Sequence, residues 1–160
     1  MREIKALPLS KKDFVSFGDV IEIDGIADKV INNGKCARYH NLAHLDILEG
    51  YPGISLFNAQ IQSLPYELNM MERHPFGSQA FIPMAYVPFL ITVAKDYQGF
   101  PDLPKAFIST PGQAINFHRN TWHGILTPLN APGLFAVVDR IGSGINLEEV
   151  FFESPYIITC

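Results

Sequence analysis

The sequence predicts one mainly all-β domain, folded as a β-sandwich or β-barrel with one or two short helices. Short apolar segments recur along the chain, and twelve glycines and twelve prolines punctuate them. Of the 160 residues, 48% are hydrophobic and 18% are charged, a composition that favours a folded domain with its own core. Regularly spaced short strands separated by turn residues are typical of sandwiches and barrels. No linker or repeat divides the chain, so residues 1–160 are expected to form one domain.

The first expected element is a short helix near the N-terminus. Ser10 followed by Asp13 resembles a capping box, and Phe14 and Phe17 would then dock on a sheet. Strands are expected where apolar or alternating residues lie between turn signals. These strands are Asp19–Ile23, Ile54–Gln60, Tyr66–His74, Gln79–Met84, Phe89–Val93, Ala106–Ser109, Gln113–Phe117, Leu134–Arg140 and Tyr156–Thr159. Turns rich in Asn, Gly, Pro and Ser are expected at residues 32–34, 111–112, 131–133 and 142–144.

Charge and composition exclude several classes of function. The net charge is −4 and the pI is about 5.7, whereas a nucleic-acid-binding domain usually carries a basic patch. Cys36 and Cys160 are too few for a disulfide framework, and this favours a reducing compartment. The first residues contain no apolar leader, and no apolar run approaches the length of a membrane span. We therefore expect a cytoplasmic protein with neither nucleic acid nor membrane as a partner.

The expected strand Tyr66–His74 carries a carboxylate and an imidazole on an otherwise apolar face. Side chains alternate along a strand, so Glu72 and His74 continue the apolar row formed by the preceding even-numbered residues. The odd-numbered residues, among them Met71 and Arg73, are expected to face water. Buried polar groups are costly unless they are paired. A metal ion, a substrate or a hydrogen-bond network is therefore implied beside Glu72 and His74.

Further candidate ligands follow the same strand and recur downstream. After a tight turn, a returning strand could bring Gln79 beside His74, and a second segment contains His118 and His123. Histidine and carboxylate groups suit divalent metals such as zinc, nickel, iron and manganese. Spacing alone leaves a purely structural alternative open, in which Glu72 and His74 form a hydrogen-bonded pair. In that case His123 would simply be packed beside its aromatic neighbour.

Arginines supply candidates for binding a substrate carboxylate through paired hydrogen bonds. Arg38 and His40 form one small cluster, and Arg119 lies between His118 and Asn120. Each arginine taken singly could be a solvated surface charge, and Arg140 could pair locally with its neighbour Asp139. We favour Arg119 for substrate binding.

Two long motifs resemble the bacterial ureidoglycolate lyase family, also called ureidoglycolate hydrolase. They are residues 72–83, Glu-Arg-His-Pro-Phe-Gly-Ser-Gln-Ala-Phe-Ile-Pro, and residues 117–123, Phe-His-Arg-Asn-Thr-Trp-His. Shorter segments at residues 6–9, 17–21, 31–34, 38–40 and 139–140 agree with that family as well. The resemblance implies a cupin-like β-barrel, or double-stranded β-helix.

The resemblance also implies a set of metal ligands. Glu72 and His74 stand where a cupin has its paired histidines, Gln79 stands at the carboxylate position, and His123 at the last histidine. The implied ion is divalent, usually nickel (Ni2+), with zinc (Zn2+) or manganese (Mn2+) as alternatives. Two of the four ligands are altered, and an amide oxygen is a weaker ligand than a carboxylate. Tight, permanent metal binding is therefore not expected.

The reaction implied by the resemblance is cleavage of (S)-ureidoglycolate to glyoxylate and urea, in allantoin and purine nitrogen catabolism. Glu72 would be a metal ligand or the general base, His118 the acid, and Arg119, with Arg38 and His40, would bind the substrate. Another metal-dependent cupin enzyme acting on a small hydroxy acid, or a ligand-binding cupin without catalysis, are the alternatives. A homodimer is also implied. The apolar segment Tyr156–Thr159 could pair with a second subunit or pack within its own chain.

Overall fold

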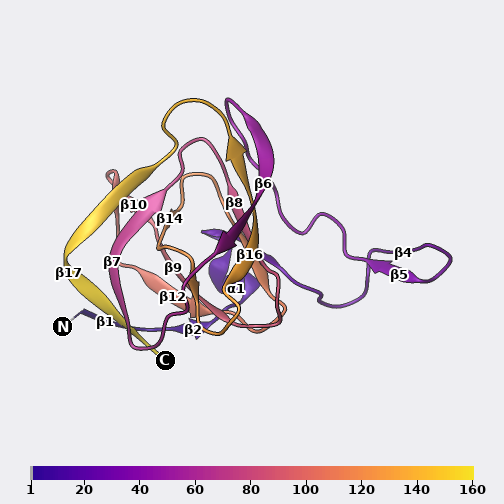
Figure 1. Cartoon of the computed structure of the whole chain (residues 1–160), viewed down its shortest axis with the longest axis horizontal. Helices are drawn as coiled ribbons and strands as arrows, with labels where there is room; N and C mark the ends of the chain where they lie inside the picture. The colour runs from indigo at the N-terminus through magenta and orange to yellow at the C-terminus, as the bar shows by residue number, and fades with distance from the viewer. Residues whose placement is uncertain (1) are drawn as a thin grey trace.

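Strands make up most of the structure, a computed structural model that describes residues 2–160 (Figure 1). The helix α1 spans Lys11–Phe14. The strands are β1 (Arg2–Lys5), β2 (Leu7–Pro8), β3 (Gly18–Ile21), β4 (Lys29–Ile31), β5 (Cys36–Arg38), β6 (Tyr51–Asn58), β7 (Tyr66–Arg73), β8 (Gln79–Pro83), β9 (Phe89–Ala94), β10 (Asp96–Tyr97), β11 (Phe100–Pro101), β12 (Lys105–Ile108), β13 (Ala114–Phe117), β14 (Trp122–His123), β15 (Thr127–Pro128), β16 (Leu134–Ile141) and β17 (Glu148–Thr159).

Two main sheets form the barrel and enclose its core. The five-stranded sheet has the order β3-β13-β8-β16-β6, and the eight-stranded sheet has the order β1-β17-β7-β14-β9-β12-β2, with β15 added to β9. The inner side chains of both sheets meet in one buried cluster, which contains Phe81, Phe117 and Val137 from the first sheet and Ile91 and Val93 from the second. This arrangement confirms the mainly all-β, cupin-like barrel expected from the sequence. Among residues 2–160, no helix is long and apolar enough to cross a membrane.

The N-terminal helix closes one end of this core, as the sequence predicts. Ser10 caps α1 by accepting a hydrogen bond from the Asp13 backbone N–H at 3.2 Å, and its hydroxyl donates to the Asp13 carboxylate at 2.7 Å. Phe14 is fully buried, and its ring packs edge-on against Phe107 with centroids 5.8 Å apart. Phe17 lies in the same cluster. The cap fixes where the helix begins, and the two aromatic rings anchor it to the sheets.

The outer face of β7 is solvated only in its first half, where Glu67 and Asn69 are exposed as expected. Met71 is completely buried in a second apolar cluster, which also contains Trp122 of β14 and Ile158 of β17. Arg73, on the same face, keeps only 13% of its side chain exposed. The prediction for Met71 and Arg73 was wrong because the eight-stranded sheet is covered on both sides. Loop residues, including Leu64, and the N-terminal segment pack on the side turned away from the first core.

The C-terminal strand is paired within its own chain on both sides. Residues Tyr156–Thr159 of β17 run parallel to Arg2–Lys5 of β1, and the same stretch of β17 is antiparallel to the beginning of β7. The segment Tyr156–Thr159 therefore packs intramolecularly and offers no free edge to a second subunit. A different long strand, β6, forms the edge of the five-stranded sheet and, within residues 2–160, pairs only with β16.

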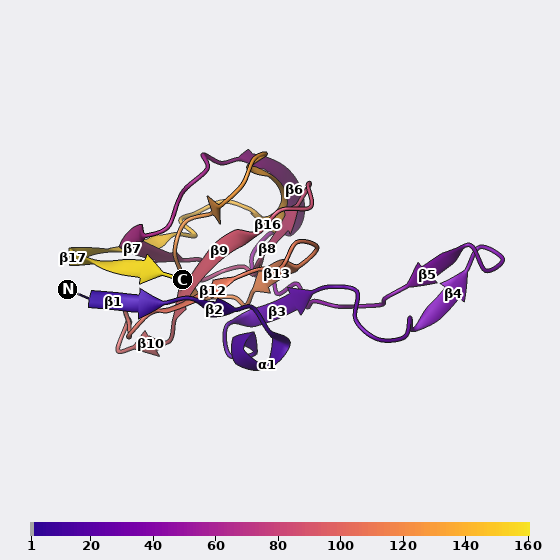
Figure 2. The ribbon, with the colours of Figure 1, turned by 90° about the horizontal axis from the view of Figure 1, so that it is seen from below.

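A β-hairpin that the sequence did not predict projects from the barrel as an arm. In the described part of the chain, strands β4 and β5 pair only with each other, and Figures 1 and 2 show them far from the two sheets. The turn expected at residues 32–34 joins them, and Asn32, Asn33 and Gly34 all have positive φ angles, which Asn and Gly tolerate best. We call residues 22–41, which include this hairpin, the arm.

Candidate active site

Three side chains converge inside the barrel, where β7 and β14 lie side by side. His123 of β14 is the direct cross-strand partner of Glu72 on β7, and His74 follows the end of β7. One ligand atom from each of the three lies within 4.8 Å of the others. The distance from His74 Nε2 to Glu72 Oε1 is 3.8 Å. Glu72 and His74 thus share the inner face, as strand alternation predicts.

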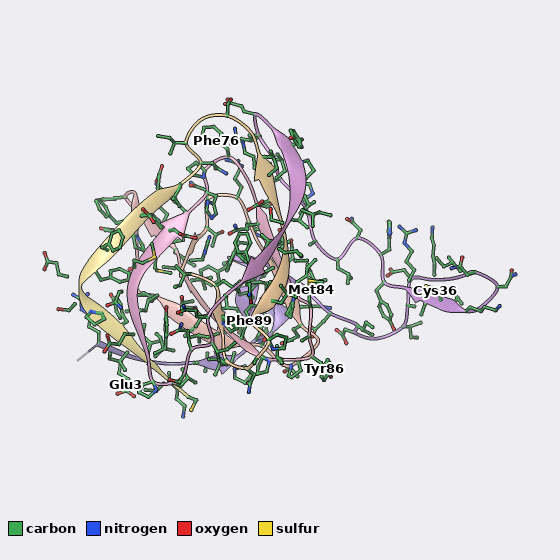
Figure 3. All side chains as sticks on the ribbon, in the orientation of Figure 1. Glu3, Cys36, Phe76, Met84, Tyr86 and Phe89 are labelled. Carbon is green, nitrogen blue, oxygen red and sulfur yellow. The ribbon has the colours of Figure 1, made fainter. Side chains whose placement is uncertain are left out.

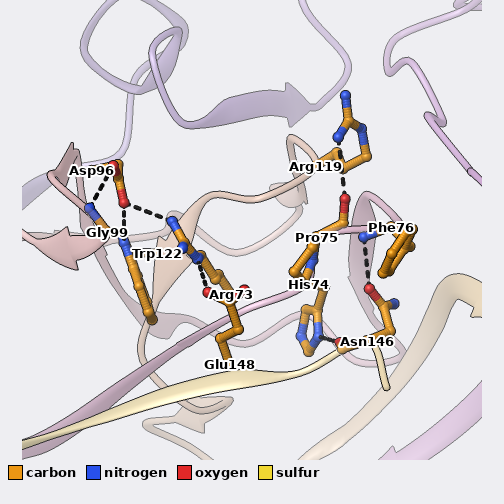
Figure 4. Close-up of polar contacts among 10 residues, drawn as sticks. All are labelled: Arg73, His74, Pro75, Phe76, Asp96, Gly99, Arg119, Trp122, Asn146 and Glu148. Atoms are coloured by element: carbon orange, nitrogen blue, oxygen red, sulfur yellow. Dashed lines mark hydrogen bonds and ion pairs between the residues drawn. The ribbon is translucent and has the colours of Figure 1, made fainter. Parts of the chain in front are cut away.

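Backbone carbonyls fix how the two imidazoles point. The Nδ1 of His74 lies 2.8 Å from the carbonyl oxygen of Asn146 (Figure 4), and the Nδ1 of His123 lies 2.9 Å from the carbonyl oxygen of Gly124. A carbonyl only accepts hydrogen bonds, so each Nδ1 carries a proton, and each Nε2 is left for another partner. Both Nε2 atoms are buried and have no hydrogen-bond partner among the described residues.

His123 is held in its neutral form. Its ring is 2% exposed and stacks on Phe117, with centroids 4.2 Å apart and planes tilted by 6°. Burial lowers the pKa of His123 to about 3, and the neighbouring His74 adds to the effect. A neutral imidazole with a free Nε2 is the form that binds a metal ion.

Glu72 has the opposite shift. Burial raises the pKa of Glu72 above its ordinary value, and the charge of Glu149, its cross-strand neighbour on β17, adds to the increase. The neighbouring His74 opposes these effects without cancelling them. A carboxylate with a raised pKa exchanges protons closer to neutral pH, so Glu72 can serve either as a ligand or as a base.

Gln79 presents a free amide oxygen to the barrel interior. Its side chain is almost completely buried, and its Nε2 donates a hydrogen bond of 3.1 Å to Asp139 on β16. Its Oε1 is buried and has no hydrogen-bond partner among residues 2–160. Across the strands Gln79 pairs with Phe117, the ring that stacks on His123. The amide oxygen is thus a further buried acceptor, on β8, which pairs with the strand that carries Phe117.

Asp139 is a residue that the sequence interpretation missed. The sequence left open that Asp139 pairs locally with Arg140, and the structure does not show that pair. The Arg140 guanidinium instead donates to the backbone carbonyls of Leu48, Glu49 and Ser143. Neighbouring residues of a strand point to opposite faces, so Asp139 turns inward and Arg140 outward. Alternation along β16 from the buried Val137 was the signal that could have identified Asp139.

His118 and Arg119 follow β13, and only Arg119 contacts the segment that carries His74. His118 Nε2 is 3.3 Å from the Asp19 carboxylate, and His118 is not one of the three residues whose ligand atoms converge. Arg119 donates to the Asp46 carboxylate at 2.8 Å and to the Pro75 carbonyl at 3.1 Å (Figure 4). Arg119 therefore contacts the residue directly after His74, whereas His118 contacts β3.

Arg38 and His40 lie on the arm. Arg38 ends β5, and the His40 backbone N–H donates to the Asp28 carboxylate within the arm at 2.8 Å. In Figure 1 the arm and the strands β7 and β14 are at opposite sides of the molecule. A single chain does not bring Arg38 and His40 to the cluster, and a role in substrate binding stays a prediction.

An ionic and aromatic network supports the strands from the opposite face. The Arg73 guanidinium contacts Asp96 at 2.6 Å and Glu148 at 2.5 Å and lies 4.4 Å above the Trp122 ring. Trp122 Nε1 donates to the same Asp96 at 3.0 Å (Figure 4). Hydrogen bonding by Trp122 is the main reason that the pKa of Asp96 is lowered. The network fixes β14, and hence His123, against β7.

The residues fit a divalent metal ion. Two imidazole Nε2 atoms, one carboxylate and one amide oxygen offer nitrogen and oxygen donors, and three of these atoms are buried without a partner among the described residues. Such a donor set suits nickel, zinc, manganese or iron. Fold and site therefore define a cupin-like β-barrel with a candidate metal centre inside.

Comparison with known proteins identifies the family. The chain belongs to the ureidoglycolate lyase family, whose model matches residues 1–159. It is similar to the ureidoglycolate lyase of Rhodobacter capsulatus, with 50% identity over 159 residues that cover 99% of both chains. Ureidoglycolate lyase 2 of Rhizobium meliloti is 52% identical over 151 residues, 93% of both chains. The ureidoglycolate lyase of a Chelativorans species is 49% identical over 160 residues, which cover 99% of this chain and 97% of that protein.

Proposed function

We propose that this protein is a carbon–nitrogen lyase that cleaves (S)-ureidoglycolate to glyoxylate and urea. The observation that carries the proposal is the convergence of Glu72, His74 and His123 inside the barrel of a chain that matches the ureidoglycolate lyase family from end to end. Ureidoglycolate is a hemiaminal, with a hydroxyl group and a urea nitrogen on one carbon. Removing the hydroxyl proton forms the aldehyde C=O bond while the C–N bond breaks, and the departing nitrogen takes up a proton. No water is consumed, so the step is an elimination.

His74, His123, Gln79 and Glu72 are the residues that would hold the metal. A divalent ion there would act as a Lewis acid toward the hydroxyl and carboxylate oxygens of the substrate. We propose nickel, with zinc or manganese as alternatives, because of the family resemblance. The carbonyls of Asn146 and Gly124 orient the two imidazoles for this role.

Glu72 is our candidate for the base that removes the hydroxyl proton. Its raised pKa supports this role, since proton transfer is most efficient when the pKa of the base lies near the working pH. His118 stays our candidate for the acid that protonates the urea nitrogen. Its contact with Asp19 lies outside the cluster, so His118→Asn is a separate test: unchanged turnover would remove His118 from the mechanism.

Arg119 is our candidate for the group that holds the substrate carboxylate. Its Nε and one terminal nitrogen are engaged by Asp46 and Pro75, which fixes the guanidinium next to His74. Among the described residues nothing bonds the other terminal nitrogen, so it could donate to a carboxylate. We further propose that the protein works as a homodimer in the cytoplasm, in the breakdown of allantoin and purine nitrogen.

The test is direct. The purified protein is incubated with ureidoglycolate, with and without added nickel or manganese, and glyoxylate, urea and ammonia are measured. Glyoxylate and urea in equal amounts without ammonia are expected. Ammonia would instead indicate hydrolysis of the urea group. The absence of any product would overturn the proposal, and oxygen uptake with a small hydroxy acid would then indicate a different cupin enzyme.

A further inference from the structure

The loop that joins β16 to β17 supplies the group that orients His74. We call residues 142–147 the β16–β17 loop. The backbone carbonyl of Asn146 lies in this loop and accepts the hydrogen bond from His74 Nδ1 at 2.8 Å. Figure 3 shows Phe76, two residues after His74, beneath the loop at the top of the barrel. The direction of the His74 ring therefore depends on where a segment 72 residues further along the chain is held.

Little in the β16–β17 loop itself would hold it in place. Residues 142–144 are Gly-Ser-Gly, and Gly144 has a positive φ angle of 81°. Glycine leaves the backbone with more conformational freedom than any other residue. The two apolar side chains of the loop, Ile145 and Leu147, are 84% and 41% exposed. Burial of apolar side chains thus contributes little to the position of the Asn146 carbonyl.

The ends of the loop are fixed by the neighbouring strands. Arg140 of β16 donates from Nη2 to the Ser143 carbonyl at 2.8 Å. Glu148, the first residue of β17, is the cross-strand partner of Arg73 on β7. Of residues 144–147 between these two anchors, only Asn146 is not fully exposed. The side chain of Asn146 is therefore the group best placed to fix the middle of the loop.

The Asn146 side chain fastens the loop to the turn that follows β7. Its Oδ1 accepts a hydrogen bond from the Phe76 backbone N–H at 2.7 Å (Figure 4). Asn146 thus contacts the turn twice, through its side chain at Phe76 and through its backbone carbonyl at His74. The bond to Phe76 uses only the acceptor oxygen of the amide.

The turn that receives these contacts is also held by other parts of the chain. The backbone carbonyls of residues 74, 75 and 76 all accept hydrogen bonds. Their donors are, in that order, Asn120 at 2.9 Å, Arg119 at 3.1 Å and Leu48 at 2.8 Å. Loss of the Asn146 side chain would therefore release the loop and leave the turn in place. The carbonyl that orients the His74 ring would move, while the His74 backbone would not.

We propose that the Asn146 side chain is a positioning group for His74. By fastening the loop to Phe76, it places the Asn146 carbonyl where His74 Nδ1 can donate to it, and His74 Nε2 is then directed toward Glu72. The proposal rests on the proposed function in one respect, the role of His74 as a metal ligand. The orientation of the ring itself can be measured without metal or substrate.

Three variants of Asn146 separate the hydrogen bond from the size of the side chain. Asn146→Leu keeps the size but removes the acceptor, and Asn146→Asp keeps an acceptor oxygen in the same place. Asn146→Ser is a second loss variant, since its oxygen lies one bond nearer the backbone, and it serves if leucine disturbs the loop. The matched control is Gln113→Leu, because the Gln113 amide oxygen also accepts a backbone N–H, from Thr110 at 2.8 Å.

The first measurement follows the imidazole nitrogens of the metal-free protein by NMR at about pH 8, where an ordinary histidine is neutral. In the native chain and in Asn146→Asp, His74 should carry its proton on Nδ1 only. In Asn146→Leu and Asn146→Ser the proton should be shared between Nδ1 and Nε2, because the carbonyl that selects one tautomer has moved. His123 is the internal control: its acceptor is the carbonyl of the next residue, Gly124, so it should keep its tautomer in every variant.

The second measurement is competition for nickel with a chelator. Groups that orient a metal ligand typically contribute 10- to 100-fold in affinity, so Asn146→Leu and Asn146→Ser should each bind nickel at least roughly tenfold more weakly. Asn146→Asp should bind nickel no more weakly than the native chain, since an added negative charge attracts a cation. Gln113→Leu should bind nickel like the native chain, although it removes three hydrogen bonds from another turn.

The opposing results are distinguishable. A single Nδ1 tautomer of His74 in both Asn146→Leu and Asn146→Ser would overturn the proposal. Equal loss of nickel affinity in Asn146→Asp or in Gln113→Leu would overturn it as well, because the bond to Phe76 would then not be the cause. A native chain that bound no nickel would overturn the metal-binding role of His74 in the proposed function, and the NMR result would still decide whether Asn146 orients the ring.

Discussion

Replacing Asp139 by Asn tests how the amide of Gln79 is held. A carboxylate only accepts hydrogen bonds, so Asp139 holds the Gln79 nitrogen toward itself and leaves the amide oxygen facing the interior. An Asn at this position both donates and accepts. It would permit the amide of Gln79 to rotate and to present its nitrogen to the site, where a nitrogen that carries two protons cannot bind a metal ion.

The size of the effect follows from the geometry. Partners that orient a metal ligand typically contribute 10- to 100-fold in metal affinity. Asp139 acts on one of four proposed ligands through one 3.1 Å hydrogen bond, so we expect the lower end, roughly tenfold. Asp139→Ala removes the acceptor altogether and leaves the buried Nε2 of Gln79 unpaired. That variant should also lower the free energy of unfolding by about 1–3 kcal/mol.

The assay is competition for nickel with a chromophoric chelator, together with urea unfolding of the metal-free protein. Asp24→Asn is the control, since Asp24 also accepts a side-chain hydrogen bond, from Lys11 at 3.3 Å, but its side chain is 68% exposed. The control should bind nickel like the native chain. If Asp139→Asn did the same, the oriented amide oxygen of Gln79 would not be a ligand, and the reasoning would fail.

Three other predictions follow from the site and its support. His74→Ala should abolish urea release and leave circular dichroism unchanged; a variant with near-normal turnover would remove His74 from the mechanism. The pKa of His123 is lowered to about 3 by burial, so below about pH 6.5 the unfolded chain binds a proton that the folded chain does not. The metal-free protein should therefore lose stability as the pH falls from 6.5 toward 3, at up to about 1.4 kcal/mol per pH unit, and His123→Asn should remove this contribution. Met71→Ala should cost about 2–5 kcal/mol in urea unfolding, because Met71 is fully buried, whereas the half-exposed Met84→Ala should cost far less; equal losses would contradict the second core.

Local patterns predicted those parts of the molecule that depend on local geometry. Alternation along one strand placed Glu72 and His74 on the inner face, because the period of two holds wherever a strand continues. The capping pattern at Ser10 located the helix for a similar reason, since cap and capped N–H are three residues apart. Both predictions depend only on residues that lie close together in the sequence.

Other features depend on segments far apart in the sequence. Alternation says which residues share a face, but it does not say whether that face is covered. Met71 was assigned to water because the residues that cover it belong to other segments, such as Leu64 and the N-terminal strand. The strand residues of the arm, β4 and β5, are exposed throughout and show no apolar alternation, so they gave no strand signal.

The hydrogen bond between Gln79 and Asp139 affects the metal affinity expected when an amide replaces the carboxylate of the cupin ligand set. An amide in place of a carboxylate predicts a weak ligand, since it carries no charge and can rotate to present either oxygen or nitrogen. Asp139, sixty residues later in the sequence, prevents this rotation because it accepts a hydrogen bond from the amide nitrogen of Gln79. A group held in its binding orientation loses less conformational freedom when it binds, so part of the lost affinity is recovered. The negative charge of Asp139 therefore lies near the site, but Asp139 contacts the amide nitrogen of Gln79 and not the oxygen that would bind the metal. That oxygen stays neutral, and a metal ion held there would retain more positive charge to attract an anionic substrate than one bound directly by a second carboxylate.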